Sequence, residues 1–110
     1  METETKQRHC VEVAAFMSAA ANAKRLSVLE LLTQMEHSVG ELSTLVGLRQ
    51  SALSQHLSRL RRGRLFETRR DAQTIYYSSR SPAVATLLST LEAILPVITS
   101  QKVRPDVGRA

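Results

Sequence analysis

The sequence contains a single cysteine, Cys10. One thiol forms no disulfide within the chain and falls short of every cysteine-based zinc pattern. The sequence also lacks a glycine-rich phosphate loop, a metal-ligand cluster, and any Cys-His or Ser-His-Asp pattern in a recognisable context. These absences argue against an enzyme, and we expect neither a metal nor a cofactor.

We also expect no membrane-spanning helix, since no apolar run approaches the roughly 18 residues that a membrane span needs. The first eight residues are polar and include Glu2 and Glu4, unlike a signal peptide. We therefore expect a cytoplasmic protein with no membrane partner. A length of 110 residues corresponds to one domain. We place this domain at 9–100, between disordered tails at 1–8 and 101–110.

Positive charge is concentrated in the middle third of the chain. Residues 49–80 contain eight arginines and no lysine, against Glu67 and Asp71, for a net charge of +6. Residues 1–48 carry four cations against six glutamates, for a net charge of −2. Arginine's planar fork suits phosphates and guanine edges. The middle third therefore indicates binding to nucleic acid, although charge alone also fits a solvated basic face.

Two helices are predicted at the start of the domain. Residues 9–21 are rich in alanine and carry apolar side chains at helical spacing. Asn22 is a predicted N-cap for the second helix, roughly 23–35, whose leucines form a buried stripe.

A helix-turn-helix is predicted next. Ser38 and Glu41 stand at capping-box spacing and open a third helix, which Gly47 closes. The following helix, about 50–62, begins after a short connection, and two helices joined in this way form a helix-turn-helix.

The helix at 50–62 has two predicted faces. Leu53, Leu57 and Leu60 recur at i, i+4 and i+7 and are expected to pack inward. The opposite face is small and hydrogen-bonding near its N-terminus and basic near its C-terminus. Gln55 carries the amide group that pairs with adenine in a major groove.

A β-hairpin follows, because 65–70 and 74–79 are short runs rich in β-branched and aromatic residues. A basic hairpin after a recognition helix is a wing, whose arginines lie over phosphates or enter the minor groove. The predicted DNA-contacting residues of the helix and the wing are Arg49, Gln50, Ser51, Ser54, Gln55, Ser58, Arg59, Arg62, Arg69, Arg70 and Gln73.

The last helix is predicted to begin at Ser81 and Pro82 and to end or kink near Leu95, because Pro96 follows. Its apolar surface is broader than a small monomer exposes, which indicates a two-fold dimer formed together with the first helix. The predicted dimer-interface residues are Val13, Phe16, Met17, Ala20, Val84, Leu87, Leu88, Leu91 and Leu95.

Four segments together resemble the ArsR family of winged-helix repressors: ANAKRLSVLELL (21–32), SVGELSTLVGL (38–48), SALSQHLSRLR (51–61) and TRRDAQTIYYS (68–78). Within the family the sequence is most similar to the metal-independent branch that includes the rhizobial nodulation repressor. The resemblance implies a mainly α fold with a small β-hairpin, a winged helix-turn-helix of five helices plus the wing. It also implies a homodimer through the first and last helices that represses transcription by occupying a dyad-symmetric operator in double-stranded DNA, at the nucleoid.

The sequence departs from the family in its sensing sites. Many members carry Cys-x-Cys at the start of the third helix, where this sequence has Ser38 and Gly40, which supply no thiolate. The last helix offers only Glu92 as a ligand.

A second departure is Arg49, whose cation opposes the dipole of the recognition helix. Either Ser51 takes over as the cap or Arg49 meets a phosphate.

Three alternatives stay open. One is a redox- or metal-responsive repressor that uses Cys10 with His9 and His37 across the dimer; otherwise His37 is expected on a surface loop. A second is a non-specific architectural DNA-binding protein. A third is a protein-binding module that uses the winged fold as a docking surface. The sequence identifies no effector.

Overall fold

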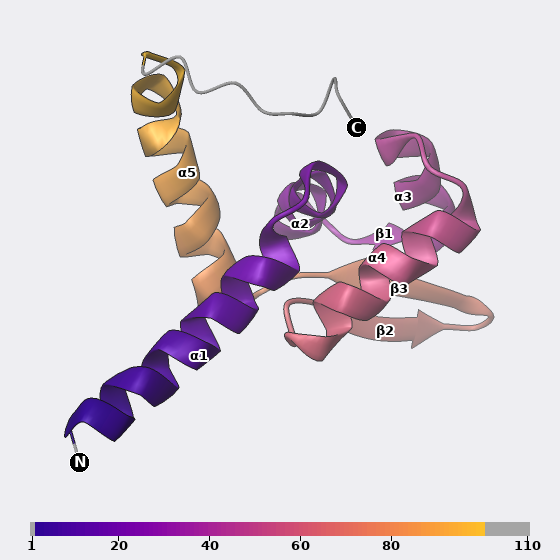
Figure 1. The fold of residues 1–110 in the computed structure, drawn as a ribbon. Coiled ribbons are helices and arrows are strands. Elements are labelled where there is room, and N and C mark those ends of the chain that lie inside the picture. Colours follow the sequence, from indigo (N-terminus) through magenta and orange to yellow (C-terminus); the bar gives the residue numbers. More distant parts are fainter. Residues whose placement is uncertain (1, 101–110) are drawn as a thin grey trace.

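The computed structural model describes residues 2–100 (Figure 1). The helix-turn-helix and the sheet lie together on one side, and the first and last helices project away from them. The elements are α1 (Glu2–Ala20), α2 (Ala23–Gln34), β1 (His37–Ser38), α3 (Val39–Val46), α4 (Gln50–Arg62), β2 (Glu67–Asp71), β3 (Thr74–Ser78) and α5 (Pro82–Ser100). The predicted fold of five helices and a hairpin is confirmed.

The inner helices begin where their capping signals predict. The Asn22 Oδ1 atom accepts the backbone N–H groups of Lys24 and Arg25, at 2.9 and 3.1 Å. The Ser38 hydroxyl accepts the Glu41 N–H, and the Glu41 carboxylate accepts the Ser38 N–H, which completes the predicted capping box. These contacts satisfy backbone donors that a helix N-terminus otherwise leaves without partners.

The first helix is longer than the sequence predicts. It begins at Glu2 instead of residue 9, so that residues 2–8 are helical where we expected a disordered tail. Glu2 and Glu4 lie in its first turn, where negative side chains interact favourably with the positive end of the helix dipole.

The last helix begins as predicted, with the Ser81 hydroxyl accepting the Val84 N–H at 3.2 Å. It then continues through Pro96 to Ser100, so of the two expected effects of this proline, an end or a kink, the end is wrong. Pro96 removes the hydrogen bond to the Glu92 carbonyl, and its ring crowds that carbonyl. Because the surrounding residues are exposed, water can replace the missing donor. The predicted tail at 101–110 lies outside the described residues.

The last helix also corrects the expectation about apolar runs. It has 19 residues with a mean hydropathy of 1.6, and Glu92 is its only charged residue. By length and composition alone, such a helix can cross a membrane. Its N-terminal half nevertheless belongs to the domain, because Val84 is buried in the core and Leu87 and Leu88 pack against it.

The sheet contains one strand more than predicted. The hairpin consists of β2 and β3 with a two-residue loop, and the strand order is β1-β3-β2, antiparallel throughout. In β1, His37 pairs with Tyr77 and Ser38 pairs with Tyr76. A two-residue strand is too short to show an alternating pattern. It joins the hairpin to the start of α3.

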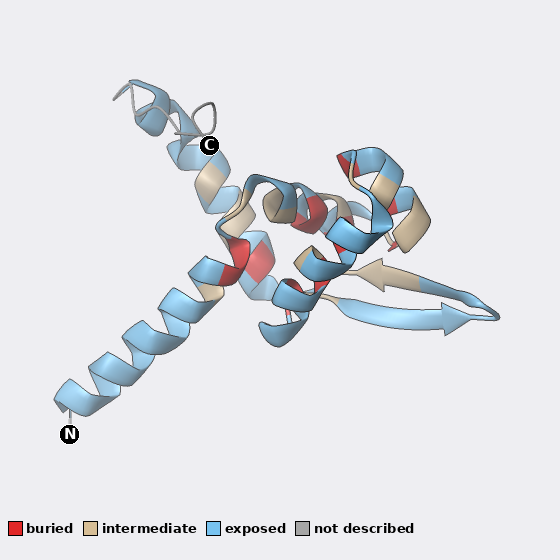
Figure 2. Ribbon diagram, turned by 45° about the vertical axis from the view of Figure 1, so that its right-hand side comes forward, coloured by how far each residue is buried: buried red, intermediate tan, exposed pale blue. Residues whose placement is uncertain are grey.

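The core lies where the end of α1, the three helices α2, α3 and α4, and the start of α5 meet (Figure 2). His37 is 7% exposed, so the expectation that it lies on a surface loop is wrong. Ser79 is also buried; its hydroxyl donates to the Leu65 carbonyl and its N–H donates to the Leu32 carbonyl. These bonds attach the end of the hairpin to the core.

Candidate nucleic-acid interface

The turn between α3 and α4 is fixed by short polar contacts. Gly47 ends α3 in the left-handed conformation, with φ of 68°, as its position in the sequence predicts. The Ser43 hydroxyl donates to the Leu48 carbonyl, and the Ser43 carbonyl accepts the Leu48 N–H at 3.0 Å. From α2, the Lys24 ammonium donates to the Val46 carbonyl. These bonds satisfy the Ser43 and Val46 carbonyls in the last turn of α3 and fix the connection to α4.

The recognition helix α4 covers the predicted range and has the predicted two faces. Leu53, Leu57 and Leu60 are at most 3% exposed. The helix residues and N-cap that we predicted to contact DNA are all exposed: Arg49, Gln50, Ser51, Ser54, Gln55, Ser58, Arg59 and Arg62. The small side chains near the N-terminus of α4 leave room for close approach to a major groove.

Arg49 is the N-cap of α4, and its side chain makes no capping hydrogen bond. Ser51 lies inside the helix, so it does not replace Arg49 as the cap. Arg49 is exposed, and it immediately precedes the first turn of α4, whose backbone N–H groups form the positive end of the helix dipole. Both attract anions, which favours the second explanation from the sequence, a phosphate at Arg49.

The recognition helix ends in a Schellman motif. Gly63 is the C-cap, but the left-handed residue is Arg64, with φ of 56°. The Leu65 N–H donates to the Leu60 carbonyl at 3.2 Å, and the Arg64 N–H donates to the Arg61 carbonyl at 2.9 Å. An arginine thus occupies a backbone conformation that favours glycine.

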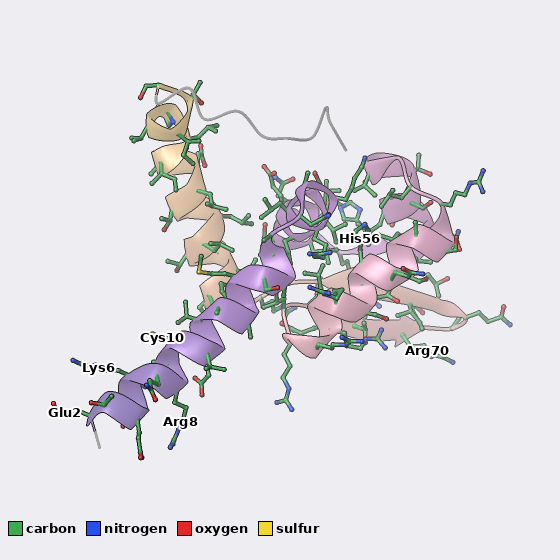
Figure 3. The ribbon with its side chains drawn as sticks, in the orientation of Figure 1. Glu2, Lys6, Arg8, Cys10, His56 and Arg70 are labelled. Carbon is green, nitrogen blue, oxygen red and sulfur yellow. The ribbon has the colours of Figure 1, made fainter. Side chains whose placement is uncertain are left out.

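The two arginines of the wing lie on opposite faces of the sheet. Arg69 is paired with Tyr76, and Arg70 is paired with Ile75. Directly opposed residues share a face, and neighbours along a strand alternate. Arg70, toward the outer end of the hairpin (Figure 3), therefore shares the face of Tyr77, which packs against the core. Arg69 lies on the other face.

Arg69 is engaged by a carboxylate. Its Nε atom lies 2.9 and 3.1 Å from the two Glu36 carboxylate oxygens, and its Nη2 atom also donates to Glu36. Its Cζ atom lies 4.7 Å from the centroid of the Tyr76 ring. The hydrogen bonds from Arg69 lower the pKa of Glu36, and those to Glu36 raise the pKa of Arg69. Arg69 is therefore in a different environment from Arg70.

Arg61 belongs to the same surface, although our sequence analysis missed it. Arg61, Ile75 and Tyr77 line an open groove between α4 and the hairpin. The Arg61 Cζ atom lies 5.7 Å from the centroid of the Phe66 ring. The signal was present in the sequence, because Arg61 follows Ser54 by two helical turns and shares its face.

Arg25, in the first turn of α2, connects the C-terminal end of α1 to α4. Its guanidinium donates to the carbonyls of Ala19, at 2.6 Å, and Ser18, at 3.3 Å. Its Nη1 atom lies 3.3 Å from Nδ1 of the half-buried His56, which Figure 3 labels. Because a guanidinium only donates, this His56 nitrogen is unprotonated. Burial lowers the pKa of His56, and the Arg25 charge lowers it further.

The residues predicted for a dimer interface fall into three groups. Ala20 and Val84 are 3% and 0% exposed within one chain, so they belong to its own core and are not available to a partner. Val13, Met17 and Leu95 are more than half exposed. The half-buried remainder comprises Phe16, Leu87, Leu88 and Leu91, and the exposed apolar surface of α5 also includes Ile94, Val97 and Ile98.

The candidate sensing residues are not brought together within one chain. Cys10 is exposed on α1 with His9 beside it, whereas His37 is buried in β1, away from that helix (Figure 1). Between residues 2 and 100, no group of three or more His, Cys, Asp or Glu side chains is placed to hold a metal ion.

The recognition helix has one buried apolar face and one exposed polar face, a tight turn precedes it, and a basic hairpin follows it. This arrangement defines a winged helix-turn-helix DNA-binding protein. A family model described as "Bacterial regulatory protein, arsR family" matches residues 22–67, from the N-cap of α2 to the start of β2. The chain belongs to this ArsR family, whose members are transcriptional regulators and not enzymes.

Similar proteins cover most of the chain. The nodulation protein NolR of Rhizobium meliloti is 60% identical over 84 residues, which are 76% of this chain and 69% of NolR. The transcriptional activator HlyU of Vibrio cholerae is 39% identical over 94 residues, which are 86% of this chain and 87% of HlyU.

Solved structures agree in fold. The crystal structure of NolR from Sinorhizobium fredii matches with a TM-score of 0.80 and 53% identity, over 82% of this chain and 90% of that one. The solution structure of a homodimeric winged helix-turn-helix DNA-binding domain from Mycobacterium bovis matches with a TM-score of 0.73 and 32% identity, over 83% and 84%. The predicted resemblance is confirmed.

Proposed function

We propose that this chain represses transcription as a homodimer that binds a dyad-symmetric operator, in the cytoplasm at the nucleoid. The observation that carries the proposal is the exposed polar face of α4, beside the groove that Arg61 lines and the Arg70 face of the hairpin. One such surface reads one half-site. A two-fold dimer repeats it one helical turn, or a multiple of a turn, along the duplex.

Within each half-site the residues have separate roles. Gln55 pairs with an adenine edge in the major groove, and Ser54 reaches a neighbouring base or phosphate. The arginines of α4 and Arg70 of the wing neutralise phosphates, which sets the register of the protein on the duplex. Sequence preference therefore depends on the first two turns of α4, and general affinity depends on the arginines.

The dimer forms through the exposed apolar surfaces of α1 and α5. Val13 and Met17 of α1 and Leu95 of α5 are more than half exposed. An apolar surface of this extent is unusual on a small monomer and marks an interaction site. The similar domain from Mycobacterium bovis is homodimeric, which supports the same assembly here.

Repression is the favoured outcome of binding. Between residues 2 and 100, every element belongs to the DNA-binding unit or to the two projecting helices. Occupation of a promoter needs no further surface for contact with RNA polymerase. We also propose that binding requires no metal and no cofactor.

Selection of bound sequences from a random duplex pool tests specific binding. The enriched duplex is expected to contain a dyad. Its affinity should fall by about 10³ to 10⁵ between 50 and 200 mM salt if each dimer neutralises roughly six to ten phosphates. A scrambled duplex of the same length is the control. Equal affinity for both duplexes contradicts a specific regulator and favours the architectural alternative.

Transcription in vitro from a promoter that carries the selected operator tests repression. The protein is expected to lower the transcript yield, and a higher yield instead shows activation, the role named for HlyU. Binding is expected to be unchanged by a chelator, and unchanged by an oxidant in both the wild type and Cys10→Ser. A loss of binding with oxidant in the wild type alone supports the redox alternative.

A further inference from the structure

The outer face of the wing carries a contact that the proposed DNA binding does not use. Arg69 lies on β2, the outer strand, and its guanidinium extends across β3 to the Glu36 carboxylate, 33 residues earlier in the chain. On the way it stacks on Tyr76, the residue opposite Arg69 in the ladder. The guanidinium is thus bonded at one edge and packed on one face.

The position of Glu36 in the chain determines which elements this contact connects. Glu36 immediately precedes β1, the strand that leads through the Ser38 cap into α3. β1 itself contributes only two residue pairs to the sheet. The Arg69–Glu36 pair therefore adds a side-chain link between the outer strand of the wing and the first helix of the helix-turn-helix.

We propose that Arg69 is a positioning residue that sets the angle of the wing, and that Arg70 alone of these two arginines binds phosphate. The inference rests on the proposed function. If Arg69 turned to a phosphate, it would leave the Glu36 carboxylate without its partner close to an anionic backbone. Arg70 leaves the sheet on the opposite face, the face that continues into the groove beside α4.

The two roles predict opposite effects of Glu36→Gln. If Arg69 binds DNA, this change releases a cation and removes a nearby negative charge, so affinity for the operator rises and the dependence on salt becomes steeper. If Arg69 positions the wing, the change loosens the link and affinity falls while the salt slope is kept. We expect the second result, with affinity about two- to fivefold lower, because an exposed ion pair is individually weak.

Further variants separate positioning from loss of charge. Arg69→Gln should lower affinity as much as Glu36→Gln, and the double variant should be no worse than either single one, because both remove the same link. The exchanged pair Glu36→Arg with Arg69→Glu should recover affinity toward that of the wild type. Arg70→Gln is the matched comparison and should reduce the salt slope by about 0.9 for each phosphate lost.

The measurement is the affinity for the selected operator by fluorescence anisotropy at several salt concentrations, with the folded fraction of each variant checked by circular dichroism. A higher affinity for Glu36→Gln, or a reduced salt slope for Arg69→Gln, overturns the inference. Failure of the wild type to prefer its operator to a scrambled duplex contradicts the proposed function instead, so the two failures are distinguishable.

Discussion

Two residues adopt left-handed backbone conformations although they carry side chains. Arg64, after the recognition helix, has φ of 56°, and Ala72, in the two-residue loop of the hairpin, has φ of 57°. A residue with a Cβ atom is strained there by roughly 1 kcal/mol relative to glycine. These positions identify where the free energy of unfolding can be raised without a change in the core.

Arg64→Gly is therefore expected to raise the free energy of unfolding by about 0.5 to 1 kcal/mol, and Ala72→Gly by a similar amount. Urea denaturation at neutral pH measures both. Arg59→Gly is the matched control, because it places the same change at an exposed position in the interior of α4, where glycine should cost about 1 kcal/mol. If Arg64→Gly is as destabilising as the control, the Schellman motif does not depend on backbone strain at this position.

His56 gives the chain a pH-dependent component of stability. The pKa of His56 is lowered in the folded protein, first by burial and then by Arg25, and Arg59 and Arg62 line the same groove. The unfolded chain therefore binds the proton more readily. The contribution of neutral His56 is complete above its unfolded pKa of about 6.5 and is lost as the pH falls from there toward the folded pKa.

We expect the melting temperature of the wild type to fall between pH 7.5 and pH 5.5 by more than that of His56→Gln. The carboxylate of Glu36, whose pKa is lowered, titrates in a more acidic range and does not interfere. His9→Gln replaces an exposed histidine on α1 and should retain the pH dependence of the wild type. Equal pH dependence in the wild type and His56→Gln contradicts the assignment.

At the scale of the element, the recognition helix separates specificity from affinity. Gln55→Ala is expected to weaken operator binding by about 1 to 3 kcal/mol for each lost bidentate contact and to relax the preference at one position of each half-site. Affinity for scrambled DNA should hardly change. Repeated selection with the variant measures the preference directly. Gln34→Ala, an exposed glutamine of α2, is the control and should bind like the wild type.

The elements that the sequence predicts well are those with local signals. The Asn22 cap, the Ser38 and Glu41 capping box and Gly47 each involve residues a few positions apart, and each is present in the structure. β1 and the partner of Arg69 depend on contacts between residues more than 30 positions apart. A single sequence does not specify such pairs, because they depend on how the hairpin packs against α3.

Two further differences concern the proline in α5 and the predicted dimer surface. A proline normally ends a helix because it lacks an N–H group. Pro96 lies in the exposed part of α5, where water compensates for the lost hydrogen bond. The pattern of the dimer surface was predicted from apolar spacing alone, which does not distinguish a residue that packs on its own core from one left exposed. Ala20 and Val84 belong to the first kind, and Met17 and Leu95 belong to the second.

At the scale of the whole molecule, the two projecting helices determine whether the chain reads one half-site or two. Leu95 is 59% exposed on α5 and lies outside the core of its own chain. A symmetric interface contains each residue twice, so one substitution places two carboxylates in the same apolar contact. Leu95→Glu is therefore expected to dissociate the dimer while the helix-turn-helix stays folded.

Sedimentation velocity should show a dimer for the wild type and a monomer for Leu95→Glu, with similar helical circular dichroism. Leu45→Glu is the matched control, because Leu45 is 56% exposed on α3, which lies away from α1 and α5 (Figure 1), and its variant should remain dimeric. The monomer should lose far more affinity for the full operator than for a duplex with one half-site, since only the dimer gains from the second half-site. A Leu95→Glu protein that stays dimeric places the interface elsewhere and removes the basis for a dyad-symmetric operator.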